Sequence, residues 1–406
     1  MDGFLTVGHR AAVAAVHAML AGSVPHALLI TGPASVGKVS LAEDLAAALL
    51  CTGATGDARP CRQCRGCRTV EHGNHPDLHR LGPVGSGGQV VIGGADASVR
   101  PGIRDLVDDL ALLPVEGGAR VAIVRDAHRA NEMAQSALLK TLEEPPSGTY
   151  LLLCADDEEL LLPTIRSRCA RIRLGTVDVR DVEQLLVGRD LADAPTAARL
   201  ARVSAGRTGV AMAYARSPEA LRLRDELART FLDLLGDGPA VRLAGAKGLQ
   251  QRAMDLATRL AAPPDTTVAG GSLPKGARSK PAARPPVPSD DPGQDDDAAE
   301  GGEAEATRTS KVSPQERRAA VGVLVEAWRD VARDIALVGR GAAASVRDPG
   351  LLEEYEAAAR GLPSGAAAAF VARTVRAGEL LGGNVTPELV LDWLLLGWPR
   401  RGWAAT

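Results

Sequence analysis

Short apolar runs alternate with helix-like segments over the first 174 residues of the chain. The apolar runs predict strands over 27–31, 89–92, 120–124, 150–154 and 170–174. Between them, apolar residues at helical spacing predict helices over 39–51, 103–113 and 131–143. Because strands that alternate with helices favour a mainly parallel sheet, we expect an α/β domain over residues 1–174.

Beyond residue 174 the pattern is helical only. It predicts helices over 178–186, 196–203, 210–215, 218–235, 314–338, 351–362, 366–381 and 387–396. Residues 263–311 consist mainly of Pro, Gly, Ala, Ser and charged side chains, a composition that cannot bury enough apolar surface to fold. We therefore expect a small helical domain over 175–222 and a larger one over 223–406, interrupted by a disordered linker at 263–311. A tether or insertion is favoured over a binding tail.

Composition narrows the class of protein. The 406 residues exceed what one core usually serves, and 47 basic against 50 acidic side chains leave a net charge of −3. Such a balance gives no global attraction to nucleic acid or to an anionic membrane. No apolar run reaches the roughly 18 residues of a membrane span. His17 interrupts the stretch 11–21, which loosely resembles a signal-peptide core, so we expect a cytoplasmic protein without a membrane partner.

A glycine-rich loop follows the first predicted strand. Residues 32–40 read GPASVGKVS, between the apolar run 27–30 and a helical segment. In this context Gly32 and Gly37 let backbone N–H groups turn inward, and Lys38 reaches a β- or γ-phosphate. The position after the lysine, however, is Val39, which lacks the hydroxyl that ligates Mg²⁺. Ser40 comes next, about 100° further around the helix.

A second departure from an ATP-hydrolysing site follows the predicted strand 120–124. Enzymes with such loops place acidic residues there to hold the metal and activate water. This chain has Arg125 and Asp126, and a cation beside Mg²⁺ has the wrong sign. Both departures argue against binding of ATP with Mg²⁺. The alternative is an active ATPase in which Ser40 and Asp126 restore the metal site.

Four of the six cysteines lie close together in the sequence. Cys51, Cys61, Cys64 and Cys67 supply the four thiolates of a tetrahedral structural zinc site. Nearby histidines could replace one ligand: His72, His75 and His79. Four arginines alternate with the cysteines, namely Arg59, Arg62, Arg65 and Arg68, and could offset thiolate charge, lie in solvent or contact phosphates. A zinc-dependent DNA-binding module is therefore a further alternative. Cys154 lies in a predicted strand and is interpreted as a core residue.

Several motifs together resemble one family. VPHALL at 24–29, the four-cysteine module, NHPDLH at 74–79, ALLKTLEEPP at 137–146 and TIRSRC at 164–169 resemble the delta-prime subunits of the bacterial DNA polymerase III clamp loader, in the AAA+ superfamily. The resemblance covers residues 1 to about 215. It implies an AAA+ domain with an inserted zinc module at 51–67, a helical lid over 175–222 and a C-terminal collar that joins subunits in a ring.

The resemblance also implies roles for single residues. Arg168, in the SRC motif, would act as an arginine finger in the ATP site of a neighbouring subunit. The segment 206–211 resembles the one that carries a sensor arginine in active subunits, but this chain has Gly209 there and Arg207 two positions away. We therefore expect a largely ATPase-inactive stator rather than a gamma/tau subunit. Its partners would be the gamma/tau and delta subunits and, through the complex, the sliding clamp and primed DNA.

Overall fold

The computed structural model describes residues 3–84, 88–93, 102–116, 118–261, 312–383 and 385–399. The chain divides into two units, Met1–Ala262 with Ser313–Thr406, and Pro263–Val312. The predicted linker at 263–311 lies outside the described residues.

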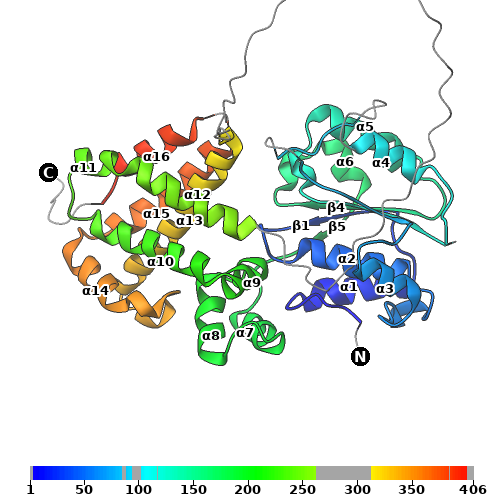
Figure 1. Ribbon diagram of the computed structural model, residues 1–406, viewed down its shortest axis with the longest axis horizontal. Coiled ribbons are helices and arrows are strands. Elements are labelled where there is room, and N and C mark those ends of the chain that lie inside the picture. The colour runs from blue at the N-terminus through cyan, green and yellow to red at the C-terminus, as the bar shows by residue number, and fades with distance from the viewer. Residues whose placement is uncertain are drawn as a thin grey trace, which may run out of the picture. The chain divides into compact units, whose positions relative to one another are not determined.

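A parallel sheet forms the centre of the N-terminal half, with the strand order β2-β3-β4-β1-β5 (Figure 1). The strands are β1 (Ala27–Thr31), β2 (Leu78–Leu81), β3 (Arg120–Val124), β4 (Thr149–Ala155) and β5 (Ala170–Arg173). Every residue of β1 and β3 is buried, which explains why these strands read as unbroken apolar runs. Strand β1 lies between β4 and β5 and is parallel to both. The loop that follows β1 therefore lies at the carboxyl edge of the sheet, where ligands of α/β proteins bind.

Helices cover both faces of this sheet, with α1, α2 and α3 on one side and α4, α5 and α6 on the other (Figure 1). Their bounds are α1 (Arg10–Ala21), α2 (Lys38–Leu49), α3 (Arg65–Glu71), α4 (Ile103–Leu110), α5 (Glu132–Glu143) and α6 (Pro163–Arg168). Alternate residues of β1 serve the two sides: Leu28 and Ile30 pack in the core with α1 and α2, whereas Leu29 packs in the core with α4 and α5. The predicted α/β fold class is confirmed.

One of the five predicted strands is wrong. Residues 89–92 form only isolated bridges, of Gln89 with Val84 and of Val90 with Ala130. The edge of the sheet beside β3 is occupied by β2, which the apolar pattern did not predict. Val90 is buried under the helices instead. The carbonyl groups of Val91 and Ile92 accept hydrogen bonds from the first N–H groups of α4, so this apolar stretch caps a helix.

Beyond residue 174 the described residues are helical, as predicted. The helices are α7 (Val179–Gly188), α8 (Ala194–Val203), α9 (Thr208–Arg216), α10 (Pro218–Asp233), α11 (Pro239–Ala244), α12 (Ala246–Ala261), α13 (Pro314–Val338), α14 (Leu352–Gly361), α15 (Ala366–Gly382) and α16 (Pro387–Leu396). Local chemistry fixes their starts: α13 begins with a capping box of Ser313 and Glu316 and has Pro314 at its first position. Each predicted helix is found within three residues at either end. Helices α1, α3, α6, α11 and α12 were not predicted.

The helical half has one continuous core, which runs from Val177 to Trp398. At its centre four aromatic rings pack edge to face or tilted, those of Phe231, Trp328, Phe370 and Trp398. This core includes residues on both sides of position 222, so the boundaries proposed at 174 and 222 stay a prediction. Across the described residues no helix has both the length and the apolar character needed to cross a bilayer.

Candidate functional site

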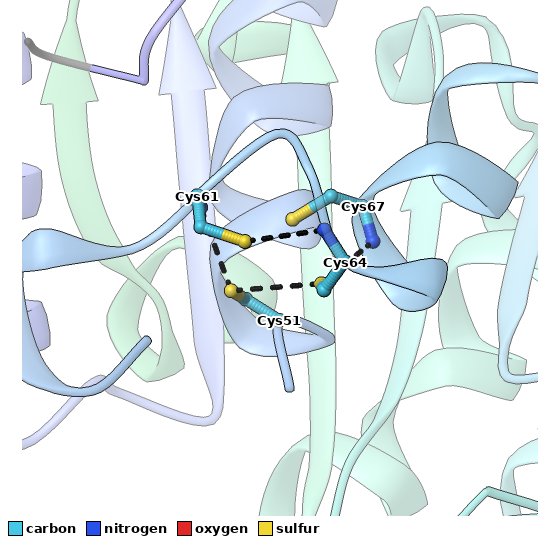
Figure 2. A group of neighbouring side chains, drawn as sticks. All are labelled: Cys51, Cys61, Cys64 and Cys67. Atoms are coloured by element: carbon cyan, nitrogen blue, oxygen red, sulfur yellow. Dashed lines mark hydrogen bonds between the residues drawn. The ribbon is translucent and has the colours of Figure 1, made fainter. Parts of the chain in front are cut away.

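The four predicted metal ligands come together at the C-terminal end of α2 (Figure 2). Cys51 comes two residues after the end of α2, Cys61 and Cys64 lie in the next loop, and Cys67 is in the first turn of α3. Their sulfur atoms lie within 4.8 Å of one another. Backbone N–H groups of Cys61, Cys64 and Cys67 donate to the sulfurs of Cys51, Cys61 and Cys64 at 3.5, 3.4 and 3.4 Å. The cluster could hold a metal ion.

The electrostatics of the cluster fit a metal. Although burial alone would raise it, hydrogen bonds from the Cys67 backbone and from Thr52 lower the pKa of Cys64 to about 5, so a thiolate ligand is ready at neutral pH. Burial raises the pKa of Cys67, the deepest of the four, which a bound cation would offset. The backbone is equally adapted, since a Cβ on Gly53 would lie 2.8 Å from the Cys61 sulfur.

The arginines between the cysteines have partners within the chain. Arg62 pairs with Asp44, a carboxylate only 2% exposed, and donates to the Gly3 carbonyl oxygen at 2.6 Å. Arg59 donates to the Gly56 carbonyl oxygen, Arg68 donates to that of Gln63, and Arg65 pairs with Glu116 at 3.1 Å. Their first role is therefore structural. None of His72, His75 and His79 belongs to the described four-cysteine cluster.

The glycine loop occupies the predicted position between β1 and α2. Gly32 has φ +149°, and a Cβ there would lie 2.2 Å from the Leu174 carbonyl oxygen, so only glycine fits. Gly37, with φ +108°, precedes the first residue of α2. Beside the loop is a cavity of about 640 Å³, whose lining includes Gly37, Lys38, Val39, Ser40, Asp126, His128, Asp156, Thr208 and Gly209. The loop thus has the shape of a phosphate site.

Lys38 is turned back onto its own chain. Its ammonium donates to the carbonyl oxygens of Gly32 and Pro33 at 2.8 and 2.7 Å, and it lies 2.6 Å from Asp156 Oδ1. The side chain is only 6% exposed. Because an ammonium group has three N–H bonds, these contacts use all of its donors.

Of the residues that stand where an ATPase has its magnesium ligands, some line the cavity and one does not. Val39, Ser40 and Asp126 line the cavity, and Asp126 has a left-handed backbone with φ +49°. Arg125 is not among the lining residues that the structure describes; it is exposed and lies near Gly82. The expectation that Arg125 stands beside the metal position is therefore wrong, because the tight turn at Asp126 directs the acid, not the base, into the cavity.

Two residues of this site were missed by sequence reasoning, His128 and Asp156. Together with Asp126 they place ligand atoms within 4.8 Å of one another, a spacing that could hold a metal ion, but the Lys38 ammonium already contacts Asp156. Burial lowers the pKa of His128, which the neighbouring acids only partly oppose. Only its position in the sequence could have indicated Asp156, because this residue directly follows β4, the strand that pairs with β1.

The segment 206–211 contacts the loop without offering it a cation. The Gly209 N–H donates to the Ser35 carbonyl oxygen at 2.8 Å, and a Cβ on Gly209 would lie 3.1 Å from that of Ser35. Arg207 points elsewhere, as expected, and forms an ion pair with Glu326 of α13 at 2.5 Å. No arginine of this segment lines the described cavity.

Arg168 ends α6 and belongs to a different surface from the loop. Its guanidinium pairs with Glu143 at 2.6 Å and donates to the Thr164 carbonyl oxygen at 3.0 Å, and the side chain is 35% exposed. It is absent from the described lining of the cavity. The next residue, Cys169, is buried, and burial raises its pKa to about 11, so this thiol has a packing role.

Residues 9–178 match the family model described as DNA polymerase III, delta subunit. The DNA polymerase III subunit delta' of Haemophilus influenzae is 42% identical over 144 residues, which cover 36% of this chain and 41% of that protein. The α/β domain thus resembles DNA polymerase III subunits, those named delta' among them. The matched residues contain the glycine loop, the cysteine cluster and Arg168.

Other relatives that match this domain carry a different subunit name. The DNA polymerase III subunit tau of Escherichia coli is 34% identical over 191 residues, 46% of this chain and 28% of that protein. The chain thus spans less than half the length of either relative. Among solved structures, a DNA polymerase III gamma subunit-related protein from Thermotoga maritima is 16% identical, with 94% of this chain and 97% of that chain covered and a TM-score of 0.35. A score this low adds nothing to the fold described above.

Proposed function

We propose that the chain is a clamp-loader subunit of DNA polymerase III, of the delta-prime kind, which acts as a largely ATPase-inactive stator. One observation carries this proposal: Arg168 is partly exposed and lies outside the described lining of its own loop's cavity, in the domain that the family model matches. An arginine placed there could reach the nucleotide of a neighbouring subunit. There a guanidinium would stabilise the charge that develops on the γ-phosphate during ATP hydrolysis.

The chain's own loop supports the stator assignment. Val39 supplies no oxygen to a magnesium ion, Gly209 supplies no charge, and every donor of Lys38 is already used. The rival assignment, an active gamma/tau-like ATPase, has one observation in its favour, since both Ser40 and Asp126 line the cavity. The relatives do not decide between the two, because delta-prime and tau proteins both match this domain.

We propose that the cysteine cluster holds structural zinc. Four sulfur ligands complete a tetrahedral shell, and a complete shell has no open position for a substrate or a reacting water. The zinc would fix the loop 51–64 and α3 against the end of α2. The DNA-binding alternative is weakened because each of the four arginines has a contact within the chain.

The partners follow from the same assignment. We expect the gamma/tau and delta subunits as ring neighbours, and contact with the sliding clamp and primed DNA through the assembled complex. The site of action would be the cytoplasm, with the replication machinery. The helices beyond residue 178 lie outside the matched family region, and their role as lid and collar is part of the proposal.

Calorimetry on the full-length chain, combined with an ATPase assay, tests the stator assignment. We expect no turnover of ATP in the presence of Mg²⁺. Magnesium-dependent binding with turnover would contradict the stator and favour the active ATPase. Titration with primed DNA over a range of salt concentrations tests the third assignment, because phosphate contacts give a steep salt dependence. We expect weak binding, and tight salt-sensitive binding by the chain alone would favour the DNA-binding module.

A further inference from the structure

The carboxylate of Asp156 lies where the glycine loop would receive an anion. We propose that Asp156 is the residue that excludes nucleotide phosphates from this loop, by supplying Lys38 with an internal anion. The proposal rests on the stator function above, because it names the cause of the loop's inactivity. It differs from the loss of a magnesium ligand at Val39, which would weaken metal binding but leave the lysine free for phosphate.

The contacts of Lys38 support this role. Of the three acceptors around the ammonium, the two carbonyl groups belong to the loop itself and only Asp156 carries charge. A phosphate that entered the loop would have to displace this carboxylate from a lysine that is only 6% exposed. The displaced carboxylate would then stand unpaired in the same cavity as the phosphate, where the two negative charges repel each other.

The position of Asp156 is fixed by the sheet. Ala155, the last residue of β4, is in register with Thr31 of β1, and its carbonyl oxygen accepts from the Gly32 N–H at 3.3 Å. The Asp156 N–H donates to His128 Nδ1 at 3.2 Å. In the neutral ring the proton therefore lies on Nε2, which is 4.0 Å from the second oxygen of Asp156. Asp156 thus lies between Lys38 and His128.

Asp126 adds to the exclusion without taking part in the pair. It lines the same cavity and has a ligand atom within 4.8 Å of those of His128 and Asp156. Against these two carboxylates the described lining offers two cations, Arg129 and Lys38, and Lys38 is already paired with Asp156. A phosphate site needs a different balance, with donors and cations in excess.

The test is a titration of the full-length chain with ADP and with inorganic triphosphate, both without metal. The variants are D156N and D156S, with D157N as the matched control, since Asp157 is an exposed neighbour whose side chain only caps the Glu159 N–H. We expect neither wild type nor D157N to bind at about 1 mM ligand, and D156N and D156S to gain at least about tenfold in affinity. Addition of K38A to D156N should abolish the gain.

Every outcome decides the proposal. If both variants melt like wild type and gain no affinity, Asp156 does not exclude phosphate. If wild type binds as tightly as D156N, the exclusion does not exist. If both variants unfold, Asp156 is a folding residue and the assignment is wrong. The stator function fails by a separate result, ATP turnover by the wild-type chain, so the two failures are distinguishable.

Discussion

The cysteine cluster and the phosphate loop lie at opposite ends of α2, about 18 Å apart along the helix axis. At the C-terminal end all four ligands converge, and the local backbone makes room for their sulfur atoms. At the N-terminal end the glycines keep the loop's shape, but the lysine is bound to the chain's own carboxylate. One end has all four metal ligands in place, whereas at the other end the loop keeps its shape but its lysine has no free N–H donor.

This difference shows that a loop can keep its backbone geometry after its side chains have lost the ability to bind a ligand. Gly32 and Gly37 have conformations that ordinary residues rarely adopt, so the loop is held by packing against Leu174 as much as by any ligand. A structural metal site cannot lose its ligands and keep its shape, because the fold of the segment 51–67 depends on the ligands themselves. We therefore expect changes at the cluster to cost stability and changes at the loop to cost little.

Loss of the metal ligands should have the largest effect. We expect C64S to lose zinc and to lower the free energy of unfolding of the zinc-loaded protein by more than about 5 kcal/mol. Metal analysis and thermal melts of the reduced protein measure both quantities. The control is C169A, a buried cysteine outside the cluster, which should keep about one zinc ion per chain. Equal zinc content in C64S and wild type would remove the metal site.

Removal of the partner of Asp44 comes next. In R62A the carboxylate of Asp44, 2% exposed, keeps its hydrogen bonds from Leu5 and Thr6 but loses its cation, so we expect a cost of about 3 kcal/mol. The control is R65A, whose side chain is 81% exposed and which should cost less than about 0.5 kcal/mol. Denaturant unfolding separates the two. A stable R62A with weakened DNA binding would instead support the DNA-binding module.

A methyl group beside the cluster should have a moderate effect. In G53A the new Cβ would lie 2.8 Å from the Cys61 sulfur and 3.0 Å from the Cys64 Cβ, so the ligands must move, at a cost of about 2 kcal/mol. Competition with a zinc chelator should show roughly tenfold weaker binding. G175A, where no atom lies within 4 Å of the new group, is the control. Unchanged zinc affinity in G53A would mean that the ligands are not held in the geometry described.

Repair of the magnesium position should have the smallest effect. V39T restores a hydroxyl after the lysine, but Lys38 stays paired with Asp156, so we expect less than about a twofold change in ATP affinity. Calorimetry with and without Mg²⁺ gives the answer. Strong binding by V39T alone would show that one missing oxygen, rather than the lysine's partner, disables the loop.

The sequence predicted the parts that depend on local spacing. The strands around the loop, the helix α13 and the convergence of four cysteines all follow from residues close together in the chain. The sequence did not predict the pairing of Lys38 with Asp156, because 118 positions separate them and only the β1–β4 register brings them together. The strand predicted over 89–92 is wrong for a related reason. An apolar stretch has the same sequence pattern whether it pairs in a sheet or caps a helix such as α4.

The central claim is that this chain gives an arginine to a neighbour's ATP site and does not use its own. Its most direct test is ATP turnover by the complex reconstituted with R168A, with K38A and, as a matched control, with R166A, an arginine of the same helix paired with Glu159. We predict that R168A alone lowers turnover, by up to about 10³-fold at the site that receives the arginine, while K38A and R166A turn over ATP like wild type. Unchanged turnover with R168A, or a loss with K38A, would contradict the account.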